Sequence, residues 1–125
     1  GSLTKEMAQF LFQSSLIITP CRVSRDDIVG QGWIEVFLKQ ASQDIEKPPI
    51  LTVLNGVNKR SSILSHVIEQ LKEDGVQVAE TCISQRVCFA ETNVNKISVI
   101  GYNKPATEEI VDLTNEALNL IKSEA

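Results

Sequence analysis

The sequence predicts a layered α/β fold, in which a mostly parallel sheet is flanked by helices. Two observations predict it. The segment Ile50–Leu54 is almost continuously apolar, which is typical of a strand that is covered on both faces of a parallel sheet. Strand-like and amphipathic helical segments also alternate along the chain, in the order α-β-α-β-α-β-loop-α. This alternation is expected of parallel strands joined by right-handed crossovers.

The first half of the chain supplies a helix, a strand and a second helix. Apolar residues at helical spacing predict a short helix over Leu3–Gln13, and SLIIT at residues 15–19 predicts a buried strand that Pro20 stops. Asp26 and Asp27 favour the start of a helix that runs from about Asp26 to Gln43, because carboxylates stabilise the positive end of the helix dipole. An apolar stripe on this helix is expected to pack on the sheet. The stripe comprises Ile28, Trp33, Val36, Phe37 and Ala41.

The second half begins with the strand Ile50–Leu54 and an amphipathic helix over Ser61–Asp74, which Gly75 ends. The sequence VQVAETCI, residues 76–83, predicts a third strand. An irregular loop is expected from Ser84 to about Lys96, followed by a short extended piece at residues 97–100. A final amphipathic helix is expected from Pro105 to about Lys122.

Length and composition indicate one globular domain. The chain has 125 residues, of which 42% are apolar and 22% charged, and it has no apolar run long enough to span a bilayer. The formal net charge of -4 gives no overall attraction for nucleic acid, so contact with phosphates would depend on a local basic patch. Residues 1–2 resemble a cloning scar with no secretory signal after it, which leaves residues 3–125 as a single α/β domain.

Several catalytic motifs are missing from the sequence. No GxxxxGK[ST] or GxGxxG motif occurs, so the chain lacks the backbone cradle of a self-contained nucleotide hydrolase. His66, the only histidine, lies in a predicted helix without an adjacent cysteine or carboxylate group, so it predicts no catalytic site. Cys21, Cys82 and Cys88 form no CxxC pair, which predicts inert core thiols in a reducing cytoplasm.

Polar side chains follow the second predicted strand where it ends. They are Asn55, Asn58, Lys59 and Arg60, and Arg86 follows the third strand. Parallel sheets bind ligands at the carboxyl ends of their strands, Asn can pair with the edge of a nucleobase, and Lys and Arg suit phosphates. A ligand site with a local basic patch is therefore one interpretation. The other is that these are ordinary residues of solvated loops.

Three segments carry a more specific signal: LTKEMAQFLFQSSLIITPCRVSRDDI, ILTVLNGVNKR and ETCISQRVCFAETNVNKISVIGY. In this order they closely resemble the C-terminal half of ParA/Soj-type DNA partition ATPases, which are deviant-Walker P-loop proteins related to MinD. The resemblance extends from about Thr4 to Ile121. Pro20, Ser24 and Asp27 match a "PSxxD"-like loop of the family, Asn55 and Arg60 an "LNxVxxR" strand end, and Ile83 and Glu91 an "xIPxxxxxxEA" loop.

The resemblance implies a partial P-loop NTPase-type fold that lacks its N-terminal half. The phosphate-binding loop, the signature lysine and the Walker B aspartate of the family all lie upstream of the matched region. The chain is therefore expected to be a fragment or a natural truncation that has no catalytic residues, binds no metal and needs no cofactor alone, whereas the intact parent would use ATP and Mg²⁺. The sequence departs from the family at Ser84, where a Pro is frequent, and in the loop after Pro20, which lacks further prolines.

The resemblance also implies roles for individual residues. The residues expected on the adenine side of the nucleotide are Asn55, Ser84, Gln85, Arg86 and Val87. The residues expected to contact DNA nonspecifically are Arg60 and its neighbours Lys59 and Arg86. The residues expected on the ATP-dependent dimer face are Pro20, Ser24 and Asp27.

The leading hypothesis is that this chain is the C-terminal portion of a ParA-like ATPase in plasmid or chromosome partition. By resemblance, the intact protein would form an ATP-dependent dimer on DNA, and a centromere-binding protein would stimulate hydrolysis. We expect a cytoplasmic protein that does not contact membranes and that self-associates, since a half-domain exposes a strand edge. One alternative is a non-catalytic cytoplasmic α/β protein-interaction module. A weaker one is a small enzyme that depends on Cys82 or Cys88.

Overall fold

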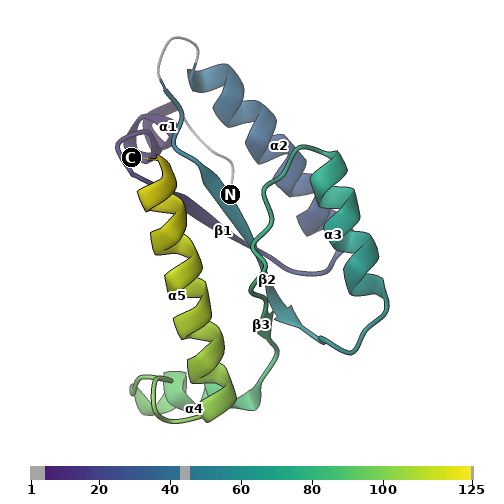
Figure 1. Ribbon diagram of the computed structural model, residues 1–125, viewed down its shortest axis with the longest axis vertical. Helices are drawn as coiled ribbons and strands as arrows, with labels where there is room; N and C mark the ends of the chain where they lie inside the picture. The colour runs from purple at the N-terminus through teal and green to yellow at the C-terminus, as the bar shows by residue number, and fades with distance from the viewer. Residues whose placement is uncertain (1–4, 43–45, 125) are drawn as a thin grey trace.

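A three-stranded parallel sheet, in the order β1-β2-β3, forms the centre of the computed structural model, and helices flank it on both sides (Figure 1). The structure describes residues 5–42 and 46–124. In chain order, the elements are α1 (Lys5–Leu11), β1 (Ile17–Cys21), α2 (Arg25–Ser42), β2 (Ile50–Val57), α3 (Ile63–Glu73), β3 (Ile83–Ser84), α4 (Val87–Asn95) and α5 (Lys104–Glu124). The predicted α/β class is confirmed.

The central strand β2 is buried on both faces, as its continuous apolar sequence predicts. Leu51 and Val53 pack against apolar residues of α5 on one face of the sheet. Leu54 points to the opposite face and packs with Val67 and Leu71 of α3. Figure 1 shows the same layers, with α2 and α3 on one side of the strands and α5 on the other. Side chains alternate along a strand, so the one strand contributes to both cores.

A buried polar cluster fixes α2 to the sheet. Gln31 of α2 is 6% exposed, and its Oε1 accepts hydrogen bonds from Thr19 Oγ1 at 2.9 Å and from Thr52 Oγ1 at 3.0 Å. The two threonine oxygens also lie 3.0 Å apart, across the β1-β2 pair. Buried hydroxyls cost free energy unless they find partners, so the cluster sets the position of α2 along the strands.

The strand β1 lies at one edge of the sheet and continues through Pro20 to Cys21. The prediction that Pro20 stops the strand is wrong. The Ile17 amide donates to the Pro49 carbonyl at 2.9 Å, and successive residues of a strand point their polar groups to alternate sides. The polar groups of Ile18 and the nitrogen of Pro20 therefore face away from β2. A proline at that position removes no hydrogen bond from the sheet.

The third strand is much shorter than predicted. Over residues 76–83, only an isolated bridge between Val78 and Thr52 and the start of β3 at Ile83 pair with β2. Between them, the amides of Glu80 and Thr81 donate to the Glu116 carboxylate of α5, at 2.8 and 3.0 Å. The chain leaves the strand ladder here because a side chain on a helix takes its backbone donors.

The segment predicted as an irregular loop contains the helix α4. Cys88 and Thr92, one turn apart, are buried, and Phe89 packs on the core beneath α5. Thr92 occupies an inward position of α4. Because threonine is polar, this position does not show in the apolar pattern of the sequence. The helix ends at Asn95 and is capped by Lys96, whose φ of 56° is left-handed. Residues 97–100, predicted to be extended, form a bend and a turn.

The apolar stripe predicted for α2 is only partly correct. Phe37 and Ala41 pack on a core cluster around Leu38, but Trp33 is 69% exposed and Val36 is also exposed. Ile28 also packs on a core cluster, and α2 has further inward positions at 31, 34 and 38. Trp33 belongs to an exposed apolar face on α1, α2 and β1. This apolar face consists of Met7, Ile18 and Trp33, which are exposed and line one pocket.

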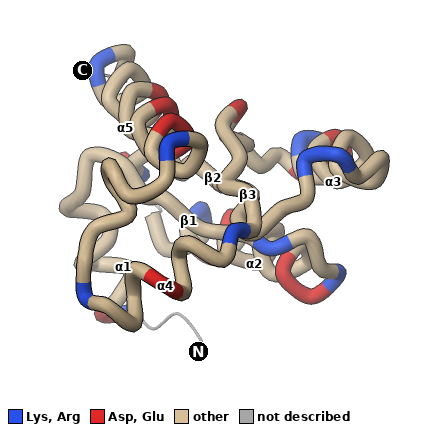
Figure 2. The backbone as a smooth tube through the Cα atoms, turned by 90° about the horizontal axis from the view of Figure 1, so that it is seen from below, with Lys and Arg blue, Asp and Glu red and all other residues tan. Residues whose placement is uncertain are grey.

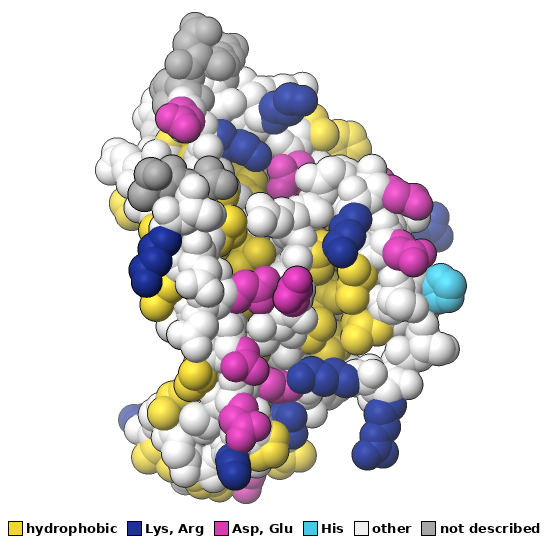
Figure 3. Space-filling view, viewed as in Figure 1, with side chains coloured by type: hydrophobic (Ala, Val, Ile, Leu, Met, Phe, Trp, Pro, Cys, Tyr) yellow, Lys and Arg dark blue, Asp and Glu magenta, His cyan; other side chains and the backbone are white. Residues whose placement is uncertain are grey.

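The prediction that Gly75 ends α3 is confirmed. Its φ is 81°, its amide donates to the Lys72 carbonyl at 3.0 Å, and the Val76 amide donates to the Leu71 carbonyl at 2.9 Å. Within the described ranges, none of the helices combines the length and apolar character that crossing a bilayer requires. Figure 3 shows apolar side chains between α5 and α3, with several Lys and Arg side chains at the lower end of the molecule.

Candidate site at the carboxyl edge of the sheet

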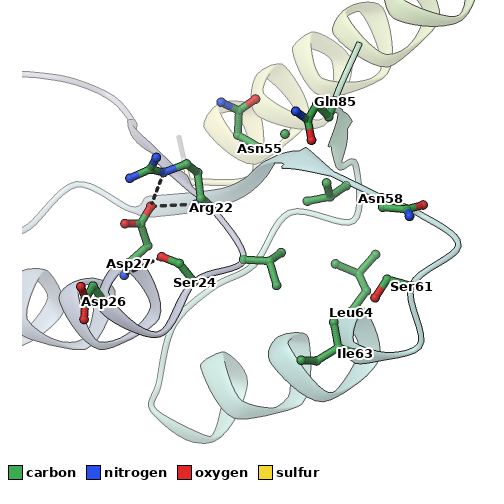
Figure 4. Close-up of a pocket in the computed structure, with 13 residues that line it drawn as sticks. Arg22, Ser24, Asp26, Asp27, Asn55, Asn58, Ser61, Ile63, Leu64 and Gln85 are labelled. Atoms are coloured by element: carbon green, nitrogen blue, oxygen red, sulfur yellow. Dashed lines mark hydrogen bonds and ion pairs between the residues drawn. The ribbon is translucent and has the colours of Figure 1, made fainter.

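The three strands end at the same edge of the sheet, at Cys21, Val57 and Ser84. A pocket of about 710 Å³ lies there, between the turns that follow β1 and β2 and the start of α3 (Figure 4). Its lining residues are Arg22, Val23, Ser24, Asp26, Asp27, Asn55, Gly56, Val57, Asn58, Ser61, Ile63, Leu64 and Gln85. Ligands of parallel α/β sheets bind at this edge, so the pocket is the candidate site.

Polar side chains surround the pocket. Figure 4 shows Asn55 and Gln85 along its upper rim, Ser24 and Asp27 to the left, and Asn58 to the right. Asn55 and Gln85 come from β2 and from the residue after β3, which lie side by side in the sheet. Their amide groups can each donate and accept hydrogen bonds.

The left wall of the pocket is held by a hydrogen-bonded turn. The Asp27 amide donates to Ser24 Oγ at 3.2 Å, which closes the first turn of α2. Asp27 Oδ2 accepts from the Arg22 amide at 3.0 Å and from Arg22 Nε at 3.3 Å. These hydrogen bonds lower the pKa of Asp27, and the bond from the Arg22 backbone amide has the largest effect. Ser24 and Asp27 thus have a structural role at the start of α2.

The end of β2 is irregular at Gly56. Asn55 pairs with Ile83 and Val57 with Ser84, so one extra residue of β2 lies between the two pairs. Gly56 has a φ of 69°, a left-handed conformation that glycine adopts without steric cost. Such a bulge bends the strand, and here it lies directly beneath the pocket.

A second, shallower pocket of about 500 Å³ adjoins the first. Its lining residues are Val57, Asn58, Lys59, Arg60, Ser84, Gln85 and Arg86. We call Lys59, Arg60 and Arg86 the basic edge. Figure 2 looks at the molecule from below and shows basic positions near the strand ends among acidic positions on the surrounding helices. Any attraction for an anion is therefore local.

Glu109 of α5 joins the turns after β2 and β3. Its side chain receives Lys59 Nζ at 2.6 Å, the Ser84 hydroxyl at 2.6 Å and the Ser84 amide at 3.1 Å. The Arg86 guanidinium contacts the same carboxylate at 3.4 and 3.5 Å. Glu109 is only 5% exposed, so three segments of the chain meet at one buried carboxylate.

Burial and hydrogen bonding act in opposite directions on Glu109. Burial of the carboxyl group raises its pKa, because it penalises the charged form. The hydrogen bonds from Lys59, from the Ser84 hydroxyl and amide, and from Arg86 lower it more, and the resulting pKa is about 2. Glu109 is therefore ionised at neutral pH, and it cancels one of the two positive charges of Lys59 and Arg86.

Arg60 differs from the other two cations of the basic edge. Its side chain is exposed and forms no ion pair with any residue in the ranges that the structure describes. The Arg60 amide donates to Asn58 Oδ1 at 3.1 Å, which fixes the backbone of the turn after β2. Arg60 thus presents its full charge to solvent from an ordered turn.

The structure brings most of the predicted site residues together. Ser24, Asp27, Asn55 and Gln85 line the larger pocket, and the basic edge, Ser84 and Gln85 line the shallower one. Pro20 lies within β1, and Val87 is the exposed first residue of α4. These two residues line neither pocket.

Sequence reasoning missed Glu109. A glutamate in an amphipathic helix is usually solvated, so Glu109 was not expected to be buried. A signal was nevertheless present, because Glu109 lies three residues after Ala106 and four before Leu113, on the inward face of α5. A carboxylate at an inward helical position needs a cationic partner or several donors.

The cysteines and possible metal ligands complete the chemistry of the chain. Cys21, Cys82 and Cys88 are free and buried, as the sequence predicts for core thiols. Burial raises the pKa of Cys21 and of Cys82, which is opposite to the depressed pKa of a nucleophilic thiol. Across residues 5–42 and 46–124, no group of His, Cys, Asp and Glu side chains is arranged to hold a metal ion.

Comparison with known proteins gives no identification. A scan against protein-family models finds no match to the chain, and a search of curated proteins finds no similar sequence.

Proposed function

We propose that this chain is the C-terminal portion of a ParA-like partition ATPase. In this proposal, Asn55 and Gln85 contact the base of ATP in the intact protein, and the basic edge contacts the phosphates of DNA. The chain alone holds no catalytic group. Dimerisation on ATP, Mg²⁺ binding and a centromere-binding partner belong to the intact protein.

One observation carries the proposal. Residues from three separate segments that resemble the family lie around adjoining pockets at the carboxyl edge of a parallel sheet. Asn55 and Gln85 supply neutral donors and acceptors that suit a base, whereas Lys59, Arg60 and Arg86 supply donors and positive charge that suit phosphates. The three cations line the shallower pocket, Asn55 lines the larger one, and Gln85 lines both.

Binding of random-sequence duplex DNA tests the DNA-binding part of the proposal. Fluorescence anisotropy at several salt concentrations should show weak binding in which log K falls with log salt at a slope of about -2 to -3, for two to three phosphate contacts. Affinity should be similar for unrelated duplexes. Absence of any salt-dependent binding at low ionic strength would contradict it.

The gene upstream of the codon for Leu3 tests the ATPase part of the proposal. A ParA-like parent requires a deviant GKGGxGKT loop in that reading frame. A reading frame without such a loop, together with no binding to DNA, would exclude the proposal.

The exposed apolar face favours a second candidate, a non-catalytic interaction module. Trp33 of α2 is 69% exposed and lines one pocket with Ile18 of β1. Exposed apolar side chains on neighbouring elements are typical of interfaces. The partner that this candidate requires is a second copy of the chain, paired along β1. A chain that dimerises through this face and shows no affinity for DNA would favour the module over the partition ATPase.

A further inference from the structure

The arrangement around Glu109 points to a role that charge alone does not explain. A carboxylate beside a phosphate-binding surface lowers the positive potential there, so it weakens attraction for a polyanion. Glu109 nevertheless lies between two of the three cations of the basic edge and contacts both. What it can contribute in return is order, because Lys and Arg side chains lose rotamer freedom when they bind.

Lys59 and Arg86 keep free donors while Glu109 holds them. A lysine ammonium has three N–H donors and an arginine guanidinium has five. Lys59 Nζ makes a single contact with Glu109, and Arg86 uses Nε and one terminal nitrogen. Both residues line the shallower pocket, and the side chains of Lys59 and Arg86 are 51% and 28% exposed. Donors therefore remain for a phosphate oxygen in that pocket.

Glu109 also fixes the two turns to each other. Ser84, at the end of β3, donates its amide and its hydroxyl to the carboxylate that receives Lys59. The turn after β2 and the turn after β3 thus share one anchor on α5. The spacing between Lys59 and Arg86 is set before any ligand arrives.

We propose that Glu109 is a positioning residue for polyanion binding, which holds Lys59 and Arg86 at a fixed spacing for consecutive phosphates of nucleic acid. The inference rests on the proposed DNA-binding function of the basic edge. It adds a residue that itself touches no ligand, and it assigns the three cations different roles. Lys59 and Arg86 act as one ordered pair, whereas Arg60 acts independently.

Glu116 provides a matched control on the same helix. It is a carboxylate of α5 that also accepts two backbone amides, those of Glu80 and Thr81, but it forms no ion pair with the basic edge. Glu109→Gln and Glu116→Gln each remove one negative charge. A purely electrostatic role predicts that both variants bind DNA as tightly as the original chain or more tightly. The positioning role predicts weaker binding for Glu109→Gln only.

The experiment measures anisotropy of a random-sequence duplex between 50 and 200 mM salt. We expect Glu109→Gln to lose about tenfold in affinity, because two long side chains must then be ordered on binding. Its salt slope should fall by about one to two, because Lys59 and Arg86 then contact fewer phosphates. Mere loss of folded protein would reduce the bound fraction without changing the slope. Glu109→Asp is the second variant: it keeps the charge but is one methylene too short to hold both turns, so it should also weaken binding.

Three results are decisive. Equal or tighter binding by both Glu109 variants, with the original chain binding DNA, would overturn the positioning role alone. An original chain that binds no DNA would overturn the proposed function and this inference with it. Weaker binding by Glu109→Gln and by Glu109→Asp, with the affinity of Glu116→Gln unchanged, would support the inference. NMR of the Arg86 Nε–H group should then show lost order in Glu109→Gln without any ligand.

Discussion

Lys59 Nζ lies 2.6 Å from Oε2 of Glu109, and this ion pair connects a half-exposed cation to a carboxylate that is almost completely buried. A buried charge is stable only when it is paired and hydrogen-bonded. Lys59, Ser84 and Arg86 together satisfy Glu109. The fold at the carboxyl edge consequently depends on the ionisation of one side chain.

Acid should remove part of the stability of the fold through Glu109. Its pKa is about 2 in the folded chain, against an ordinary 4.5. A lowered pKa stabilises the fold above the ordinary value, and this contribution is lost as the pH falls from about 4.5 towards 2. The difference corresponds to about 3 kcal/mol at neutral pH. Urea unfolding at pH 7 and pH 3 should therefore depend less on pH in Glu109→Gln than in the original chain.

Glu108→Gln is the control for the acid measurement. Glu108 precedes Glu109 on α5 but is exposed, so its removal should leave the dependence on pH nearly unchanged. If the unfolding free energies of Glu109→Gln and of the original chain decline in parallel between pH 7 and pH 3, the carboxylate is not held as the contacts indicate.

Arg60→Ala should weaken binding to nonspecific DNA and leave the fold unaffected. Arg60 is exposed without an ion pair among the described residues, so it can release a counterion for each phosphate it contacts. The salt slope should fall by about one, with a similar loss of affinity for every sequence. In the intact parent, ATP binding should remain nearly unchanged.

Lys72→Ala is the matched control for Arg60. Lys72 is an exposed cation in the last turn of α3, whereas Arg60 lies just before the first turn of that helix. Its removal changes the net charge equally but should preserve the slope. Identical slopes for Arg60→Ala and the original chain would move the DNA surface towards Arg86.

The chain alone should neither bind ATP tightly nor hydrolyse it. The motifs that hold the β- and γ-phosphates and Mg²⁺ are absent from its sequence, and the proposed contacts to the base are only one side of a nucleotide site. Calorimetric titration with ATP and Mg²⁺ should give no binding in the micromolar range. A micromolar dissociation constant would show that the chain contains a complete nucleotide site.

The chain should self-associate through β1 and the apolar face. The Ile18 amide and carbonyl point away from β2, and Trp33 lies beside them on the exposed surface. Two copies of β1 can pair antiparallel about Ile18, because the amide and the carbonyl of one residue meet their counterparts. Sedimentation should show a dimer at high protein concentration, and Trp33→Ser should shift it towards monomer.

Val94→Ser is the control for self-association. Val94 is 78% exposed on α4, and it lies outside the apolar face. Its replacement should leave the sedimentation of the chain unchanged. A sharp monomer peak for the original chain at high concentration would contradict the prediction, and equal effects of the two substitutions would locate the contact elsewhere.

The sequence predicted elements whose own periodicity is strong. The strand β2 and the helices α2, α3 and α5 follow continuous or helical apolar patterns, and the structure has them within a few residues. The failures have a tertiary origin. The third strand is interrupted because Glu116, on a distant helix, accepts the amides of Glu80 and Thr81. A side chain that competes with a neighbouring strand for backbone amides leaves no pattern in the local sequence.

The candidate site was predictable to a similar degree. The positions of Asn55, Lys59 and Arg60 follow from the rule that loops at the carboxyl edge of a parallel sheet meet. The partners of the cations do not follow from that rule. Lys59 and Arg86 share a carboxylate from α5, and only the packing of α5 on the sheet brings Glu109 to them.

Pro20 limits what the exposed edge of β1 can build. Its nitrogen faces outward and has no hydrogen, so a strand added beside β1 finds a donor at Ile18 but none two residues later. A growing fibril needs an unbroken row of donors along each new strand. The edge of β1 can therefore pair with one short strand but does not support a long row of added strands. Pro20 thus favours a finite assembly over a polymer.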